Sequence, residues 1–257
     1  MPLDITLSCV LQAVLATLMT WAFTAAGAAL VCFTARSCRT AMDGMMAAGA
    51  GVMLASSFWS LLSPGEALAQ SLGQPVWLVI SAGFLAGALL PEAGELLMRR
   101  ASLPENTRRT RLLVTAITLH NIPEGLAVGM AFGACIAGAA SLESAWLLAF
   151  GVAVQNFPEG AAVSLPLRRG GMPIRRACLS GALSGAVEPI AGLIGALLAS
   201  QVESLLPFAL CFAAGAMITV AATDLIPESR RSGRPFLMTL MTALGFAFMT
   251  VLDVALG

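Results

Sequence analysis

Residues 118–125 of this chain read TLHNIPEG, and residues 153–160 read AVQNFPEG, which repeats the first stretch after 35 residues. Both stretches lie inside long apolar segments, and each carries a glutamate there. An ionisable group at the centre of a bilayer costs roughly 2.5–3.5 kcal/mol on insertion scales, so it needs a reason to be there. The number and direction of the apolar segments decide the fold, and these polar residues indicate the function.

The composition places most of the chain in lipid. Of the 257 residues, 58% are hydrophobic and only 11% are charged, and the mean hydropathy is +0.87. These values argue against a soluble domain. The net charge is zero, with no lysine, so no basic surface is left for nucleic acid and such a partner is excluded. The six cysteines are scattered without a Cys-x-x-Cys pair and are expected to be small core residues.

Eight apolar segments are long enough to cross a bilayer, which takes about 20 residues in a helix. The segments are continuous and do not alternate at period two, which favours helices over the strands of a barrel. We therefore expect an all-α integral membrane protein, an eight-helix transmembrane bundle with inverted repeats, as a single domain over residues 1–257. The expected spans are 5–33, 41–63, 74–98, 111–138, 142–167, 173–199, 204–227 and 235–256.

The arginines indicate the orientation. All 14 lie in or beside four alternate connections between the expected spans, and the opposite connections carry acids such as Glu66, Glu143 and Glu203 but no base. By the positive-inside rule, the basic connections face the cytoplasm and both termini lie outside. The first apolar run lacks a basic stretch before it, so we expect a span and not a cleaved signal. The compact sequence suggests the inner membrane of a bacterium.

The repeat of the opening stretch is inverted, because neighbouring spans run in opposite directions. A weaker echo relates residues 47–50 and a later Pro64 to residues 213–216 and a later Pro227. Those two spans are five apart and are also antiparallel, although an echo this short can arise by chance. Inverted repeats interrupted by proline and glycine are typical of carriers with a binding site near the middle of the membrane.

Two pairs of polar residues stand on these repeated helices. His120 and Glu124 are four residues apart, and Gln155 and Glu159 repeat that spacing. Four residues make about one helical turn, so each pair lies on one face and the four groups can converge between two neighbouring helices. Further candidate ligands lie beside these pairs or in the sixth span: Asn121, Asn156 and Glu188.

An imidazole with carboxylates and amides suits a divalent transition metal such as zinc, and cadmium, iron and manganese are also compatible. Buried glutamates repel one another, and a dication compensates them best. A lone histidine in apolar surroundings is more often a hydrogen-bonded core residue than a ligand. The position of His120 before an intramembrane glutamate, beside an inverted copy of its motif, favours the ligand interpretation.

Other polar residues carry weaker signals. Met53 by itself is expected to fill a gap in the core, because the chain has 13 methionines. Four acids near the cytoplasmic ends of their spans are either interfacial charges beside arginines or part of an exit vestibule. They are Glu92, Glu95, Asp224 and Glu228. Ser60 is a weaker candidate for the same pathway.

The two Pro-Glu-Gly motifs resemble the signatures of the fourth and fifth helices of the ZIP (Zrt/Irt-like) metal transporters, and the GufA-like branch resembles this chain best. The resemblance extends over essentially the whole chain. It implies one or two ions in a site between the second, fourth, fifth and sixth spans. One ion would bind to Met53, His120, Glu124, Gln155 and Glu159. The other would share Glu124 and Glu159 and add Asn121, Asn156 and Glu188.

The sequence departs from the family pattern at two places. Many ZIP proteins have histidine at the position of Gln155 and some have aspartate at that of Asn156, so the amides here remove one bridging carboxylate. The long histidine-rich loop between the third and fourth spans is replaced by a short arginine-rich stretch, so metal sensing by that loop is not expected. The resemblance also implies a homodimer, formed through the helices other than those that bear the site.

We predict that the chain carries a divalent transition metal, zinc before others, towards the cytoplasm by an elevator or rocking motion. The chain has no phosphate-binding loop, so transport would not use ATP. One alternative is an intramembrane metal-dependent hydrolase, although its His-x-x-x-Glu spacing is not the His-Glu-x-x-His of metalloproteases. The other is a membrane protein that binds metal without transporting it. We expect no catalytic residues and no enzyme activity.

Overall fold

The computed structural model describes residues 3–33, 39–100, 105–136, 141–199 and 204–256, and its regular elements in these ranges are all helices. In chain order they are α1 (Leu3–Ala29), η1 (Leu30–Cys32), α2 (Arg39–Ser56), η2 (Ser57–Leu62), α3 (Ser63–Ser71), α4 (Val76–Arg100), α5 (Glu105–Ile136), α6 (Leu142–Arg169), α7 (Ile174–Ser184), η3 (Gly185–Val187), α8 (Glu188–Leu197), α10 (Leu206–Val220), η4 (Ala221–Leu225), α11 (Ile226–Ser229), η5 (Arg230–Ser232) and α12 (Pro235–Leu256).

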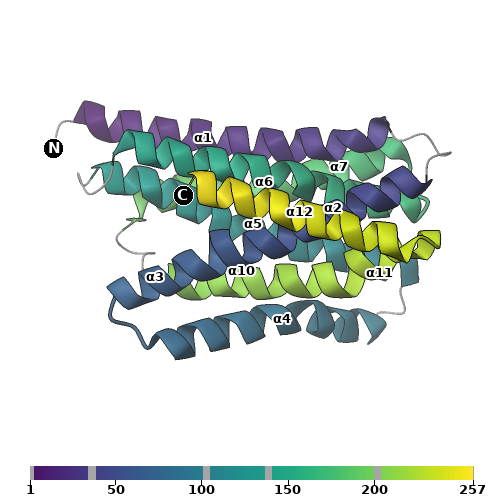
Figure 1. The fold of residues 1–257 in the computed structure, drawn as a ribbon. Helices are drawn as coiled ribbons and strands as arrows, with labels where there is room; N and C mark the ends of the chain where they lie inside the picture. The colour runs from purple at the N-terminus through teal and green to yellow at the C-terminus, as the bar shows by residue number, and fades with distance from the viewer. Residues whose placement is uncertain (1–2, 34–38, 101–104, 137–140, 200–203, 257) are drawn as a thin grey trace.

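Six helical segments of the described chain are long and apolar enough to cross a membrane. They are Leu7–Cys32, Thr40–Ser71, Val76–Ala93, Ile174–Leu197, Leu206–Ser229 and Pro235–Ala255. Helices α5 and α6 are also long, at 32 and 28 residues, but they carry the polar motifs. Helix α1 begins and α12 ends towards the same end of the bundle (Figure 1), as an even number of crossings requires. The all-helical membrane fold is confirmed, and the count of eight spans stays a prediction.

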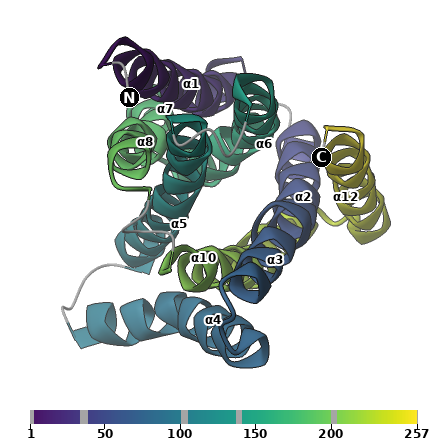
Figure 2. The same cartoon turned by 90° about the vertical axis from the view of Figure 1, so that its left-hand side faces the viewer.

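The helices form two groups, which Figure 2 shows along the bundle. In the first group, α1 packs along α6, α5 packs along α8, and α7 lies against α1 and α6. In the second group, α2 packs along α12 and α10 packs along α4, with α3 and α11 beside them. The groups meet mainly where α2 lies against α6 and where α10 lies against α5.

Reciprocal glycine contacts explain the close pairs within each group. A Cβ atom added at Gly27 or Gly160 would lie 1.8 or 1.9 Å from a carbonyl oxygen of the partner helix, so only glycine fits where α1 meets α6. Similar reciprocal contacts join α2 to α12 (Gly51 and Gly245), α4 to α10 (Gly87 and Gly215) and α5 to α8 (Gly129 and Gly195). Between the groups, Gly49 of α2 is in ordinary contact with α6, 3.7 Å from the Pro158 carbonyl oxygen. The tightest glycine contacts therefore lie within the groups.

The two spans that carry the weaker sequence echo share an unusual feature. Each passes through a π-helical turn, η2 in one and η4 in the other, and a proline follows two residues later, at Pro64 and Pro227. A proline lacks the backbone N–H and clashes with the carbonyl four residues before it, and a wider turn accommodates both effects. The echo thus corresponds to a common α–π–α conformation.

Candidate metal site

Two of the helices that carry predicted ligands continue through a proline, and a third is interrupted just before one. Helices α5 and α6 continue through Pro123 and Pro158, so the expected interruption does not occur there. The sixth span does break: α7 ends at Ser184, a 3₁₀ turn follows, and α8 begins at Glu188 with a proline in its first turn. Proline is tolerated in the first turn because the N–H there has no intrahelical partner. The break places Glu188, which is fully buried, at a helix start inside the bundle.

Gln155 of α6 connects two other helices. Its Nε2 donates a hydrogen bond to Glu124 Oε1 of α5 over 2.8 Å, and its Oε1 accepts one from Ser56 Oγ of α2 over 2.9 Å. Each of the three side chains is at most 2% exposed. The buried amide of Gln155 therefore bonds to the first group through its nitrogen and to the second group through its oxygen.

Asn156, the next residue, makes its contacts inside the first group. Its Nδ2 donates to Glu188 Oε2 of α8 over 2.8 Å and more weakly to the Thr20 carbonyl oxygen of α1 over 3.4 Å. The other carboxylate oxygen, Glu188 Oε1, accepts from Thr24 Oγ1 of α1 over 3.4 Å. This second network joins α1, α6 and α8.

The inverted copy of Asn156 is Asn121 on α5. Its Nδ2 donates to the Ser184 carbonyl oxygen over 2.9 Å, at the end of α7. The Oδ1 atoms of Asn121 and Asn156 are buried and accept no hydrogen bond in the described structure. A buried carbonyl oxygen without a donor is unfavourable, and a bound cation would satisfy it.

Glu159 and Met53 complete the described candidates, and both are buried. Glu159 lies one turn beyond Gln155 on the same face of α6. Met53 shares a face of α2 with Ser56, which contacts α6. No three His, Cys, Asp or Glu side chains form a metal-sized cluster among those that the structure describes, so the centre combines separate carboxylates with amides.

A pocket of about 370 Å³ reaches this centre at Glu124 and Gln155. Its other walls include Trp59, Ser60 and Asp253, so it extends towards the end of the bundle where α12 ends. Ser60 Oγ donates to Asp253 Oδ1 over 2.8 Å. Ser60, a weak candidate from sequence, thus lies on a cavity that leads to two predicted ligands, and Asp253 lines the same cavity.

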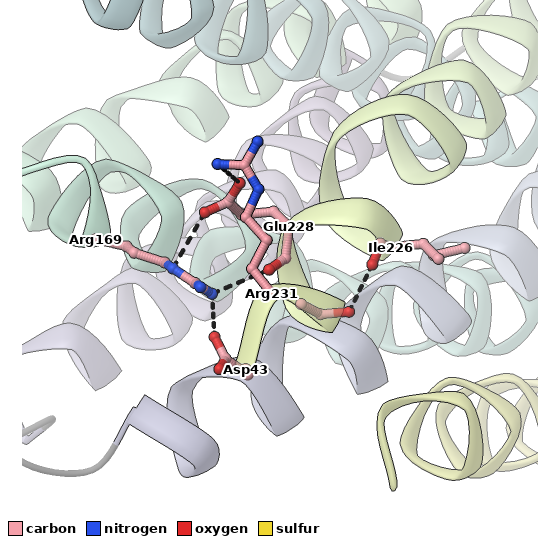
Figure 3. A network of polar contacts seen from close by, with 6 residues as sticks. Asp43, Arg169, Ile226, Glu228 and Arg231 are labelled. Atoms are coloured by element: carbon pink, nitrogen blue, oxygen red, sulfur yellow. Dashed lines mark hydrogen bonds and ion pairs between the residues drawn. The ribbon is translucent and has the colours of Figure 1, made fainter. Parts of the chain in front are cut away.

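An ion-pair network lies at the other end of the junction between α2 and α6 (Figure 3). The Arg169 guanidinium, at the end of α6, pairs with Asp43 of α2 and contacts the carboxylate and the carbonyl oxygen of Glu228 of α11, each over 3.1 Å. Arg231 pairs with the same glutamate over 3.2 Å. Of the two interpretations of Glu228, the contacts support the charge paired with arginines.

The remaining predicted residues lie apart from this centre or outside the description. Glu92 is exposed on α4, and Asp224 is half-buried in η4, where it accepts from Thr223 over 3.4 Å. The side chains of His120 and Glu95 lie outside the described residues. The structure therefore brings together seven of the eight predicted ligands by contact or by a shared helix face, with Met53, Asn121 and Glu159 placed by the face alone.

The groups that orient the ligands were not predicted from the sequence. Ser56 follows Met53 by three residues and so shares its helix face, but a single hydroxyl in an apolar span carries no pattern. A stronger signal was present in α1, where Thr17, Thr20 and Thr24 form a polar stripe and are all fully buried. Buried hydroxyls repeated on one face of a membrane helix indicate contact with polar groups of another helix.

The sequence is similar to one family of known proteins. The family model described as ZIP Zinc transporter matches residues 99–253. The chain is 38% identical over 337 aligned positions to Zinc transporter ZIP11 of Homo sapiens, covering 97% of this chain and 98% of that protein. It is 37% identical over 253 positions to Zinc transporter ZIPB of Bordetella bronchiseptica, covering 92% and 79%. It is 40% identical over 146 positions to Zinc transporter GufA of Myxococcus xanthus, covering 57% and 56%. Both Pro-Glu-Gly motifs fall within the matched range.

Proposed function

Because the chain belongs to the ZIP family of zinc transporters, we propose that the buried polar centre between α2, α5, α6 and α8 is where the transported zinc binds. The family consists of transporters, so the chain is a transporter of metal ions in the membrane and not an enzyme. The hydrolase alternative is thereby set aside.

The proposed ligands supply carboxylate, amide, imidazole and thioether groups, and these groups together suit a borderline dication. One ion would bind to Met53, His120, Glu124, Gln155 and Glu159, and a second, sharing Glu124 and Glu159, would add Asn121, Asn156 and Glu188. The free Oδ1 atoms of Asn121 and Asn156 support the second position, because both are buried acceptors. The same donor set would accept cadmium, iron or manganese.

The observation that carries the proposal is the position of Glu124 and Gln155. They are buried, bonded to each other over 2.8 Å, and line the inner part of the pocket. A carboxylate and an amide in a pocket with largely apolar walls attract a cation strongly, since few waters screen the charge there. An ion that enters from the end where α12 ends would meet Asp253 and Ser60 before it reaches Glu124.

Movement of the first group against the second would carry the ion across. The junction of α2 and α6 lacks the tight reciprocal glycine contacts of the pairs within each group, so it is the place where the groups can slide. The Arg169 network spans the groups at the end away from the pocket and would have to part when the site opens there. This is the arrangement expected of alternating access.

Orientation and assembly rest on general rules. We place the pocket outside and the arginine-rich end in the cytoplasm, so zinc moves inwards and both termini are external, with eight spans in one domain. The exposed helices of the second group would form the homodimer. The bacterial inner membrane stays a prediction, because similar proteins come from vertebrates and from bacteria.

The test is uptake of zinc into proteoliposomes, reported by an enclosed zinc-sensitive dye. The parent protein should transport, and the Glu124→Ala, Glu159→Ala double variant should not. Glu143→Ala is the matched control, because Glu143 is an exposed glutamate at the start of α6. Parent-like uptake by the double variant would refute the site, and equal, background-level uptake by all three would favour a protein that binds metal without transporting it.

A further inference from the structure

The hydroxyl of Ser56 bonds to a proposed ligand and lies on the opposite group of helices. It donates to Gln155 Oε1 over 2.9 Å, and the same amide donates from Nε2 to Glu124 over 2.8 Å. Ser56 is fully buried. Its hydroxyl therefore bonds to the end of the Gln155 amide that is turned away from the carboxylate.

The amide is turned so that its N–H₂ end faces Glu124. A cation held by Glu124 needs the oxygen end of Gln155 instead, because an amide nitrogen has no lone pair available for a metal. A half-turn of the amide about its terminal torsion exchanges the two ends, and that torsion is roughly two-fold. After the half-turn, Nε2 faces Ser56 and requires an acceptor.

A serine hydroxyl can meet both requirements because it donates one hydrogen bond and accepts others. When Nε2 donates to Ser56 Oγ, the hydroxyl hydrogen can turn to the carbonyl four residues earlier in its own helix. The next residue shows this geometry, since Ser57 Oγ donates to the Met53 carbonyl oxygen over 2.7 Å. Neither orientation of the amide then leaves a buried polar group unsatisfied at Ser56.

We propose that Ser56 is a positioning residue for zinc binding, which supports the Gln155 amide in both orientations and so allows its oxygen to turn to the ion. The inference rests on the proposed zinc site, since it assigns Ser56 a role through Gln155. It also assigns a contact between α2 and α6 that forms part of the site and is broken or re-formed when the groups move.

The experiment measures zinc affinity of the purified protein in detergent by competition with a chromogenic chelator. Ser56→Ala should weaken zinc binding by about tenfold, the loss usual for a group that orients a metal ligand. Ser57→Ala is the matched control: the hydroxyl is adjacent and equally buried but bonds only to its own helix. Its affinity should stay within about twofold of the parent, the effect of a bond that the helix can replace.

A double-variant cycle separates positioning from general packing. In a Gln155→Ala background, Ser56→Ala should have no further effect on affinity, because no amide is left to orient. Parent-like affinity of Ser56→Ala, an equal loss in Ser57→Ala, or a loss that persists without Gln155 would each overturn the role of Ser56. The Glu124→Ala, Glu159→Ala protein distinguishes the two proposals, since parent-like binding by that protein refutes the zinc site itself.

Discussion

Removing the Arg169 side chain tests whether the ion-pair network holds the two helix groups together. Asp43 is 1% exposed, and its carboxylate pairs with the Arg169 guanidinium. Loss of one partner of a buried pair costs about 3–5 kcal/mol, because the other charge is left in a medium that solvates it poorly. Since Arg169 is itself 25% exposed, we expect the lower value, about 3 kcal/mol, for Arg169→Met.

Glu228 adds little to this cost. Its side chain is 25% exposed and keeps its pair with Arg231, and partly exposed pairs contribute about 0–1 kcal/mol. For a chain of this length, 1 kcal/mol lowers the melting temperature by about 2–4 °C. Arg169→Met should therefore melt about 6–12 °C below the parent in a fluorescence-monitored thermal scan in detergent.

Two further variants isolate the cause. Arg168→Met should melt close to the parent, because Arg168 donates to the carbonyl oxygen of Met172 four residues away and bonds to no acid in the described structure. Adding Asp43→Asn to Arg169→Met should restore most of the lost stability, since the amide carries no charge that needs a counterion. A parent-like melting temperature of Arg169→Met, or a double variant as unstable as the single one, would refute this reasoning.

Two more predictions concern the pocket and the helix pairs. Asp253→Ala should raise the zinc concentration for half-maximal uptake by roughly two- to tenfold, because a charge on the pocket wall concentrates cations. The maximal rate should stay near the parent value. An unchanged concentration dependence would show that Asp253 is not on the path of the ion. Gly160→Ala should lower the melting temperature by several degrees, since a Cβ there lies 1.9 Å from the Thr24 carbonyl oxygen and overpacking costs about 1–3 kcal/mol or more. Gly151→Ala on the same helix should melt at or slightly above the parent temperature, because nothing lies within 4 Å of its Cβ position; equal losses in both glycine variants would contradict the packing argument.

The helices themselves were predictable because apolar length is a strong signal in lipid, but their ends were not. The span expected at 41–63 continues as helix to Ser71, because the π turn at Ser57–Leu62 accommodates Pro64 where a stop was expected. The span expected from 111 begins at Glu105, since a helix can extend beyond the bilayer into water with polar residues. The hydrophobicity of a segment indicates which residues lie in lipid. It does not determine where the helix begins or ends.

The candidate site was predictable where the spacing was helical. Glu124 and Gln155 came from two pairs at four-residue spacing, and the structure bonds them directly. The partners that orient them come from elsewhere in the chain and have no periodic pattern: Ser56 is 99 residues from Gln155, and Asp43 is 126 residues from Arg169. Such contacts depend on which helices become neighbours, and the order of spans along the chain does not determine that.

If the groups slide as proposed, the two neighbouring amides of α6 would differ in which contacts they keep. Consecutive residues of a helix project about 100° apart, so Gln155 faces the second group and Asn156 faces the first. Asn156 and Glu188 belong to the same group of helices, so their contact would persist in the proposed sliding of the groups. Gln155 meets Ser56 on α2, and Met53 lies on that same helix face, so the proposed motion would exchange these contacts. The change of coordination during transport would therefore occur at Met53 and Gln155, while the carboxylates of the first group stay with the ion.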